Sequence, residues 1–312
     1  MMTIRECAAA LKENDNFLIL THTRPDGDTL GSAAALCSAL RRAGKRAALC
    51  PNPEITEHYL PFVAPYLGKE TEGGFVISVD VAGEEMFPLG FSGKADLCID
   101  HHPGNPGYAA QTLLDAGKAS CGEIVMQVIE ALNGGLTPEE ASLLYTAVST
   151  DCGCFVYGNT RAETHLAAAH LIECGAEHHR LNKELFRSFS FSRLKLEGLI
   201  IESLQSYKDN ALNIAVVTLD MMRRSGATRD DCDDLASLAG KVRGNRVSIT
   251  VRELTQGVSK GSVRTDGSVD ANAVCAKFGG GGHKMAAGCM QPLAPEELAE
   301  RLREAVEAVW PE

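Results

Sequence analysis

The architecture of this chain is best inferred from the stretch Leu20-Thr-His-Thr-Arg-Pro-Asp-Gly-Asp-Thr-Leu-Gly-Ser32. The apolar run over residues 17–20 predicts a buried parallel strand, and a helical pattern follows the stretch. The loop between them therefore lies at the carboxyl end of a strand, where open α/β sheets bind their ligands. It carries one imidazole, His22, and two carboxylates, Asp26 and Asp28, and a proline and a glycine bend the backbone so that all three can turn inward.

This loop has two interpretations. A histidine and two carboxylates this close together indicate a divalent metal. However, Asp-Gly-Asp is also ordinary turn chemistry, and Asp28 could simply cap the following helix. The choice between a metal site and a simple helix cap depends on residues elsewhere in the chain.

Length and composition restrict the class of protein. A chain of 312 residues with 45% hydrophobic and 23% charged residues is long enough for two medium domains, each with its own core. The net charge of -11 opposes attraction to a long polyanion and so argues against a general duplex-binding protein. Eleven scattered cysteines indicate reduced thiols rather than a disulfide framework. With neither a signal-peptide pattern nor an apolar run of membrane length, we expect a cytoplasmic protein with no membrane partner.

Two further apolar runs of strand length end in acidic or imidazole groups. Residues 75–79 lead into Asp80, and residues 95–99 lead into Asp100, His101 and His102. The helical pattern over residues 138–150 runs into Asp151. Because the carboxyl ends of parallel strands meet at one edge of a sheet, we expect these groups to lie close to the loop at residues 22–28.

The remaining pattern predicts an α/β chain whose second half differs from its first. In the first half, helices are expected over residues 3–13, 29–43, 120–132, 138–150 and 161–174, and a strand over residues 46–50. His165 and His170, within the last of these helices, are interpreted as structural. A helical run over residues 181–205 is the candidate connection between domains. Beyond it we expect strands over residues 212–219, 246–254 and 257–264, the last two antiparallel, and helices over residues 271–278 and 294–309.

The acidic and imidazole groups at the predicted strand and helix ends imply metal chemistry. So many of them cannot stay ionised side by side without cations. Oxygen-rich ligation with one or two imidazoles suits Mn2+ or Mg2+, and the donors exceed what one catalytic ion would use. A pair of metals about 3.5–4 Å apart generates hydroxide and clamps a displacement at phosphorus. The full set is His22, Asp26, Asp28, Asp80, Asp100, His101, His102 and Asp151.

In order and in kind of spacing, these residues resemble the four motifs of the DHH phosphoesterases. Downstream, Gly261-Ser-Val-Arg264 and Phe278-Gly-Gly-Gly-Gly-His283 resemble the DHH-associated C-terminal domain. The resemblance spans nearly the whole chain and is greatest to the nanoRNase and pAp-phosphatase group. It implies a parallel-sheet metal-binding catalytic domain over residues 1–180, a helical linker over 181–207, and a smaller α/β substrate-binding domain over 208–312.

The resemblance also implies roles for individual residues. His22 and Asp26 would hold one Mn2+, while Asp28, His101 and Asp151 would hold the other, with Asp80 bridging the two. Asp100 would orient a histidine ring through the ring's far nitrogen. His102 would face the scissile phosphate, where it stabilises charge or protonates the leaving oxygen. From the residues alone, these roles cannot be divided between the two adjacent histidines.

The second half contains a candidate phosphate-binding segment. Six basic residues and one acidic residue lie between Lys241 and Arg264, although a solvated strand face would explain the lysines equally well. Arg264 differs from the lysines because it lies upstream of the glycine run at residues 279–282, with which it could bind an anion. We expect uncovered backbone N–H groups in that run to cradle an anion, with a helix beginning at Met285-Ala-Ala, although a merely flexible loop is the alternative. The predicted substrate-binding residues are Arg264, Gly280, Gly281, Gly282 and His283.

The expected function is hydrolysis of short oligoribonucleotides to mononucleotides and of 3′-phosphoadenosine 5′-phosphate to AMP. The expected cofactors are two divalent ions, Mn2+ in preference to Mg2+, and the expected partners are short single-stranded RNA or small nucleotides, with a homodimer left open. The alternatives are hydrolysis of pApA or cyclic dinucleotides, and a non-catalytic nucleotide-binding protein on the same fold. The chain departs from the family pattern at Cys152, where threonine is common, and in the stretch after Asp80.

Overall fold

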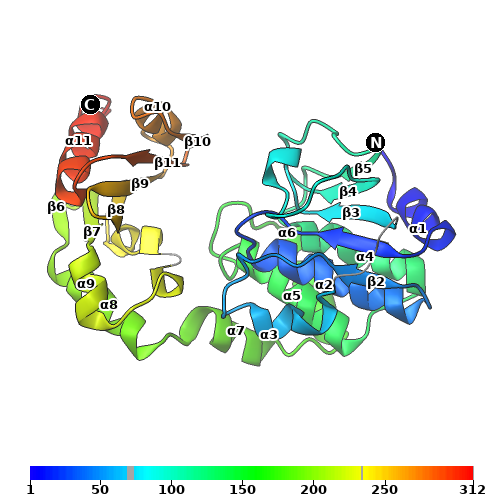
Figure 1. The fold of residues 1–312 in the computed structure, drawn as a ribbon. Helices are drawn as coiled ribbons and strands as arrows, with labels where there is room; N and C mark the ends of the chain where they lie inside the picture. The colour runs from blue at the N-terminus through cyan, green and yellow to red at the C-terminus, as the bar shows by residue number, and fades with distance from the viewer. Residues whose placement is uncertain (69–73, 233–234, 312) are drawn as a thin grey trace. The chain divides into compact units, whose positions relative to one another are not determined.

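The computed structural model describes residues 1–68, 74–232 and 235–311. The chain divides into two compact units, Met1–Ser188 and Phe189–Glu312 (Figure 1). Each unit has its own sheet and its own apolar core. We describe them separately as the first unit and the second unit.

The first unit is built on a five-stranded parallel sheet in the order β2-β1-β3-β4-β5. The expected strands are present, and the short edge strand β5 adds to them. Because all five strands run the same way, the carboxyl ends of β1, β3 and β4 share one edge, as predicted. The bounds are β1 Phe17–Leu20, β2 Ala47–Leu49, β3 Phe75–Val79, β4 Leu97–Asp100 and β5 Gln111–Leu114.

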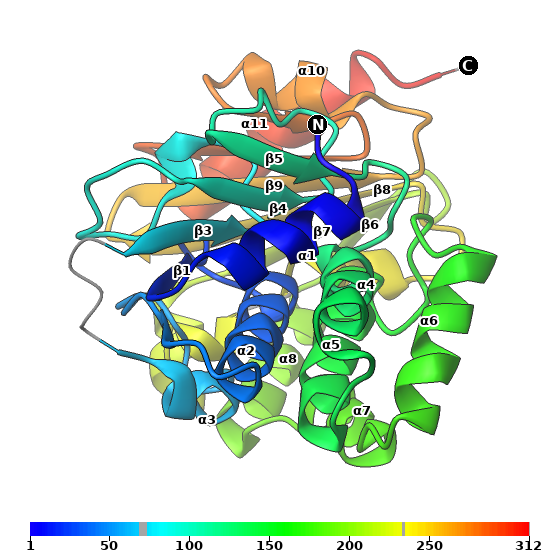
Figure 2. The ribbon, with the colours of Figure 1, turned by 90° about the vertical axis from the view of Figure 1, so that its right-hand side faces the viewer.

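Helices α2, α4 and α5 run together along one side of this sheet (Figure 2). All the long helices expected in this half are present, and several begin with strong local signals. Thr3 and Glu6 form a capping box at α1, and Thr137 and Glu140 form another at α5. The bounds are α1 Ile4–Glu13, α2 Gly27–Arg42, α3 Leu60–Val63, α4 Cys121–Asn133, α5 Pro138–Asp151, α6 Ala162–Glu173 and α7 His178–Arg187, with short 3₁₀ turns η1 Ala64–Tyr66 and η2 Glu84–Met86.

The expected continuous helix over residues 181–205 is instead two helices. Helix α7 ends at Arg187, the backbone of Ser188 is extended, and α8 begins at Phe191 and ends at Glu202. Ser190 caps α8, because its hydroxyl accepts the backbone N–H of Arg193 at 2.9 Å. Residues 187–191 contain neither glycine nor proline, so no breaker residue in the sequence revealed the break. The division between the two units falls at this break.

The second unit contains a six-stranded mixed sheet in the order β10-β11-β9-β8-β7-β6. Strands β7 and β8 are parallel, and all other neighbouring pairs are antiparallel, including the predicted pair β8 and β9. The strand bounds are β6 Gln205–Tyr207, β7 Leu212–Val217, β8 Val247–Thr255, β9 Val258–Thr265, β10 Gly281–His283 and β11 Ala286–Gln291. The helical segments are α8, α9 Leu219–Ser225, η3 Asp230–Cys232, η4 Leu235–Ser237, η5 Ala239–Lys241, α10 Ala271–Ala276 and α11 Pro295–Glu307.

The expectation of a helix at Met285-Ala-Ala is wrong, because this segment leads into strand β11. Strand β11 pairs with β9 on one side and β10 on the other, and its Ala287 and Cys289 alternate into the core of the second unit. Sheet pairing therefore outweighs the helical propensity of alanine here. Within the described part of the chain, none of the helices has the length and apolar character needed to cross a membrane.

Candidate metal centre

The structure brings all eight predicted strand-end groups to one edge of the first unit's sheet. His22 follows β1, Asp80 follows β3, and His101 and His102 follow β4. Helix α2 begins beside Asp26 and Asp28, and helix α5 ends at Asp151. In three groups of residues, potential ligand atoms lie within 4.8 Å of one another. These groups are His22, Asp26 and Asp80; Asp28, His101 and Asp151; and Asp80, His101 and His102.

Asp80 belongs to two of these groups and has the most unusual environment. Its side chain is buried, and its Oδ1 accepts no hydrogen bond from any described residue. This oxygen lies 3.4 Å from His101 Nε2, while Oδ2 lies 3.8 Å from His22 Nε2. Its backbone φ of +59° is the left-handed conformation that non-glycine residues rarely adopt. His102 Nδ1 also lies 3.5 Å from Oδ1. A buried carboxylate that faces imidazoles on both of its oxygens, one of them without a hydrogen-bond donor, fits a bound cation.

The first group is completed by His22 and Asp26. The Nδ1 of His22 donates to the carbonyl of Thr23 at 2.7 Å, which leaves Nε2 unprotonated in the neutral ring. This Nε2 lies 3.5 Å from Asp26 Oδ1. The amide of Asn52 donates to the His22 carbonyl at 3.0 Å and so holds the loop in place. Carbonyl support for one ring nitrogen is the usual arrangement around a metal-bound histidine.

The helix cap in this loop is Asp26 rather than Asp28. Helix α2 starts two residues earlier than expected, and Asp26 Oδ1 accepts the backbone N–H groups of Asp28 at 3.0 Å and Thr29 at 3.2 Å. Asp28 instead lies buried at the start of α4, where Cys121 and Gly122 donate their N–H groups to it at 2.7 and 2.9 Å. The helix N-terminus thus stabilises a carboxylate in a buried position.

The second group joins Asp28 to His101 and Asp151. The Nε2 of His101 lies 3.7 Å from Asp28 Oδ2 and 3.9 Å from Asp151 Oδ2. On the other side of the ring, Nδ1 donates to the carbonyl of Lys118 at 3.3 Å. In the neutral ring, His101 would therefore present its unprotonated Nε2 to three carboxylates, including Asp80.

Asp100 supports His102 rather than His101. Its Oδ1 accepts the Nδ1–H of His102 at 2.7 Å, together with the backbone N–H groups of both histidines. This hydrogen bond raises the pKa of His102 above its ordinary value. The structure thus separates the adjacent histidines: a carbonyl orients the ring of His101, and a buried carboxylate orients the ring of His102.

The electrostatics are those of a site that needs positive charge. Burial opposes a charged imidazole at both His22 and His101, yet the neighbouring carboxylates raise their pKa values to about 9 and about 10. Burial and the charges of Asp80 and Asp151 raise the pKa of Asp28 well above its ordinary value. Burial raises the pKa of Asp151 to about 6. In the metal-free protein, bound protons therefore offset the negative charge of the neighbouring carboxylates, and divalent ions would offset the same charge.

Three supporting groups were missed in the sequence analysis. These are the carbonyl of Lys118, the amide of Asn52 and the amide of Asn105, which donates to Asp100 Oδ2 at 2.6 Å. Main-chain groups leave no sequence signal. Asn105 follows His102 by only three positions, and its nearness to the motif was the one available clue. At Cys152, the thiol is buried and contacts the carbonyl of Val148 rather than the centre.

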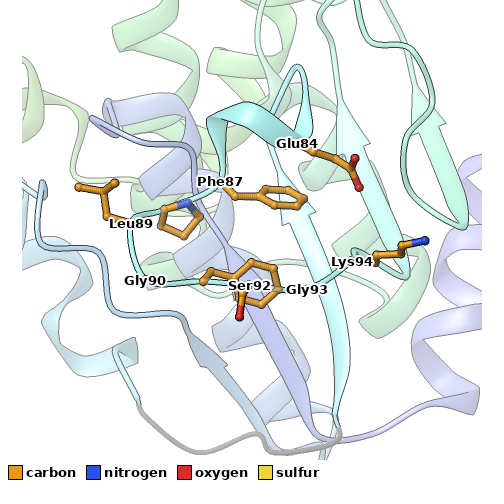
Figure 3. A pocket seen from close by; sticks show the side chains of 9 residues that line it. Glu84, Phe87, Leu89, Gly90, Ser92, Gly93 and Lys94 are labelled. Atoms are coloured by element: carbon orange, nitrogen blue, oxygen red, sulfur yellow. The ribbon is translucent and has the colours of Figure 1, made fainter.

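A pocket lies in the loop between β3 and β4 (Figure 3). The carbonyl of Met86, in the same loop, accepts the backbone N–H of Thr23 at 2.7 Å, so the loop is fastened to the residue after His22. No residue of the three ligand groups lines the pocket. It is lined by Glu84, Phe87, Pro88, Leu89, Gly90, Phe91, Ser92, Gly93 and Lys94.

The predicted substrate-binding residues lie in the second unit. In the register of its sheet, Arg264 on β9 pairs with Ala286 on β11, and Ala286 pairs with His283 on β10. Arg264 and His283 therefore project from one face of the sheet, two strand spacings or roughly 10 Å apart, with a small alanine between them. Both are exposed.

The expectation that the glycine run leaves its backbone N–H groups uncovered is wrong for three of its four glycines. Gly279, Gly280 and Gly282 donate their N–H groups to Ala276, Cys275 and Asn272, so these groups are not uncovered. The glycines instead allow close approach of β11. A Cβ at Gly280 would lie 2.2 Å from the Gly288 carbonyl oxygen, and one at Gly282 would lie 2.5 Å from that of Ala286.

Two family models match this chain. The DHH family, N-terminal domain, matches residues 16–148, and the DHHA1 domain matches residues 211–310. The chain is 33% identical over 294 residues to a bifunctional oligoribonuclease and PAP phosphatase of Thermus thermophilus, covering 92% of this chain and 88% of that protein. It is 27% identical over 284 residues to the protein of the same description from Bacillus subtilis, covering 88% of each.

A solved structure has the same fold. An exopolyphosphatase-related protein from Bacteroides fragilis superimposes with a TM-score of 0.87 at 21% identity, covering 98% of this chain and 96% of that one. At this identity the likeness concerns the fold alone.

Proposed function

This chain belongs to the DHH family and is a hydrolase of phosphoester bonds; on that basis we propose that its substrates are short oligoribonucleotides and 3′-phosphoadenosine 5′-phosphate. The products would be mononucleotides and AMP. The relatives named as oligoribonuclease and PAP phosphatase support this choice of substrates.

One observation carries the proposal. Carboxylates and imidazoles from β1, β3, β4, α2 and α5 converge around Asp80, whose buried Oδ1 has no donor among the described residues. Such an arrangement costs stability in a metal-free protein, because like charges are crowded together. It is the arrangement expected where divalent ions bind.

We propose that the ligand groups hold two divalent ions that share Asp80. His22 and Asp26 would complete one site, and Asp28, His101 and Asp151 would complete the other. Carboxylate oxygens with one imidazole at each site, and no thiolate, favour Mn2+ and admit Mg2+. When bound, such a pair supplies hydroxide at neutral pH and neutralises charge on the phosphate under attack.

His102 is the residue proposed to act on the substrate directly. Its side chain is 37% exposed, whereas those of His22 and His101 are 11% and 13% exposed. Because Asp100 accepts its Nδ1–H, the Nε2 of His102 is free to face the scissile phosphate. A raised pKa favours the charged ring, which can stabilise the developing charge or donate a proton to the leaving oxygen.

In the second unit, Arg264 and His283 are the groups proposed to bind a nucleotide phosphate. Their side chains share one face of the sheet, and the glycines Gly280, Gly281 and Gly282 leave the adjoining surface free of bulk. Arginine provides charge-assisted hydrogen bonds in a planar fork that matches phosphate. We accordingly propose residues 1–180 as the catalytic domain, 181–207 as its connection and 208–312 as the substrate-binding domain.

A phosphate-release and product assay tests the proposal. The substrates are 3′-phosphoadenosine 5′-phosphate, pApA and a ladder of 5′-labelled RNAs, each with and without added Mn2+. We expect metal-dependent turnover that is fastest on the shortest RNAs and includes release of phosphate from 3′-phosphoadenosine 5′-phosphate. Equal turnover of a dinucleotide and a chain of about twenty nucleotides would contradict the proposed substrate class.

A further inference from the structure

Asn105 occupies a junction between two motifs of the candidate centre. Its side-chain amide donates to Asp100 Oδ2 at 2.6 Å and lies 3.3 Å from the carbonyl of Val81. Val81 directly follows Asp80, and Asp100 orients His102. The Asn105 amide therefore contacts the main chain next to Asp80. It also contacts the Asp100 carboxylate, which holds His102.

The orientation of this amide is determined by a third contact. Asn105 Oδ1 accepts the backbone N–H of Gly107 at 2.8 Å, so the nitrogen of the amide must face Asp100. The turn thus holds the donor in place before any substrate binds. Asn105 is partly buried, which shields the contact from competition with water.

Asp100 depends on this donor. The carboxylate is fully buried, and the other described groups that bond it all use Oδ1. Although burial opposes ionisation, hydrogen bonds from His102 and Asn105 hold the pKa of Asp100 below its ordinary value. Without Asn105, Oδ2 would lose its hydrogen bond in a site closed to water, and the carboxylate could rotate away from His102.

The Val81 contact reaches Asp80. The carbonyl of Val81 also accepts the hydroxyl of Tyr108 at 2.9 Å, so two side chains hold the peptide that follows Asp80. Such support is needed because Asp80 has a positive φ, a strained conformation that persists only where its surroundings enforce it. Tyr108 reaches Val81, and no hydrogen bond in the described structure joins it to Asp100.

Building on the proposed function, we propose that Asn105 is a positioning residue that ties the Asp100–His102 pair to the main chain at Asp80. It sets the direction in which His102 presents Nε2 relative to the carboxylate shared by the two ligand groups. Among the described residues, no hydrogen bond joins its side chain to a proposed metal ligand. The Tyr108 hydroxyl would still hold the Val81 carbonyl beside Asp80, so the loss of Asn105 should affect the reaction step more than the binding of ions.

The test begins with the metal-free protein, labelled with ¹⁵N-histidine. The Nδ1–H of His102, hydrogen-bonded to Asp100, should give a downfield imidazole proton signal, identified by its absence in His102→Gln. Asn105→Leu removes donor and acceptor, whereas Asn105→Asp removes the donor and keeps the acceptor for Gly107. The spectra are recorded under alkaline conditions, so that Asp100 and the carboxylate introduced by Asn105→Asp are both ionised and the new side chain has no proton to donate. We expect the signal to be lost or broadened in both variants.

Two control variants separate positioning from general damage. Tyr108→Phe removes the hydroxyl that bonds Val81 and Ser78 and leaves the hydrogen bonds of Asp100 unchanged, so the His102 signal should persist. Asn133→Ala removes an amide hydrogen bond to Ala39 within the first unit, away from the centre, and should change neither the signal nor the rate. A His102 signal that is unchanged in both Asn105 variants would overturn the proposal. So would a normal signal in Asn105→Asp beside a lost one in Asn105→Leu, because the turn alone would then explain the effect.

Kinetics with Mn2+ complete the test. We expect kcat to fall about 10–100-fold in both Asn105 variants, with KM and Mn2+ affinity within about twofold of the native values. A loss of Mn2+ affinity as large as the loss of kcat would contradict a positioning role. If the native protein turned over no phosphoester, the proposed function would fail, while the His102 spectra would still decide the role of Asn105.

Discussion

Gly31 in helix α2 lies directly against Leu143 in helix α5: a Cβ at Gly31 would be 2.4 Å from the Leu143 carbonyl oxygen. Gly27, at the start of the same helix, is equally close to the side chain of Thr150. Two proposed ligands lie beside these contacts, because Asp28 follows Gly27 and Asp151 follows Thr150. The small-residue face of α2 thus sets how closely carboxylates from two helices approach each other.

Gly31→Ala should destabilise the first unit. The clashing atom belongs to the backbone of α5, so the two helices must separate. Overpacking of this kind costs about 1–3 kcal/mol in the free energy of unfolding. Chemical denaturation with and without Mn2+ measures both this loss and the expected weakening of metal stabilisation.

Gly198→Ala in helix α8 is the matched control: no atom lies within 4 Å of its Cβ position, and it should stabilise by about 0.4–1 kcal/mol. Equal effects of the two substitutions would contradict the packing argument.

Asp80→Asn should remove most of the turnover while preserving the fold. The substitution keeps the shape of the side chain and removes the charge that two of the ligand groups share. Turnover should therefore fall by at least about 100-fold, and Mn2+ should stabilise the variant less than it stabilises the native protein. Thermal unfolding with and without Mn2+, together with kinetics, checks both. Asp96→Asn is the control, because Asp96 accepts the N–H of Val76 and belongs to none of the ligand groups. A pure nucleotide-binding role would leave nucleotide affinity intact in Asp80→Asn and show no turnover in the native protein.

His101 and His102 should respond differently to the same substitution. His101→Gln removes a nitrogen that faces three carboxylates, so we expect Mn2+ affinity and turnover to fall together. His102→Gln removes the more exposed ring supported by Asp100, so we expect kcat to fall about 10²–10⁴-fold while Mn2+ affinity changes little. Calorimetric titration with Mn2+ and steady-state kinetics distinguish the two patterns. Similar losses of affinity in both variants would show that His102 is a ligand instead.

The positions of these groups could be predicted because they depend on strand ends. Apolar runs before His22, Asp80 and Asp100 place all three at the carboxyl edge of a parallel sheet, whatever the detailed packing. The roles of neighbouring residues could not be predicted in this way. Whether Asp26 or Asp28 caps the helix depends on a helix start that shifts by two residues. Whether Asp100 bonds His101 or His102 depends on side-chain directions in an irregular loop.

The second unit shows a different limit of sequence reasoning. A glycine run predicts that the backbone can adopt unusual conformations, but it does not predict which contacts those conformations make. The N–H of Gly282 donates to the Asn272 side chain, ten residues earlier, and this contact exists only in the folded sheet. Strand β11 was likewise missed, because Met285-Ala-Ala has the local composition of a helix and pairing with two neighbouring strands decides its structure.

Metal binding should tighten as pH rises. Without metal, the pKa values of His22 and His101 are about 9 and about 10, against an ordinary value near 6.5, so both rings are protonated at neutral pH. These protons stabilise the metal-free fold fully at low pH, and that stabilisation is lost as pH rises through the two raised values. A divalent ion must displace them, so affinity should rise about tenfold per pH unit for each proton released. Calorimetry in oxygen-free buffers with different heats of protonation counts the protons. Affinity that does not change between neutral and mildly alkaline pH would contradict this.

Arg264→Gln should weaken the binding of nucleotides without impairing phosphoester hydrolysis itself. Arg264 belongs to none of the three ligand groups, so its proposed contact is with a phosphate other than the reacting one. Losing a charge-assisted hydrogen bond of about 1.5–3 kcal/mol should raise KM for 3′-phosphoadenosine 5′-phosphate about 10–100-fold. Hydrolysis of bis(p-nitrophenyl) phosphate, which lacks a second phosphate, should be unchanged.

Arg243→Gln is the control, because it removes an exposed charge from the same basic segment away from the row formed by Arg264 and His283. If both substitutions raised KM equally, the effect would come from the general charge of the segment. If the simple diester were also affected, Arg264 would have to act at the reacting phosphate.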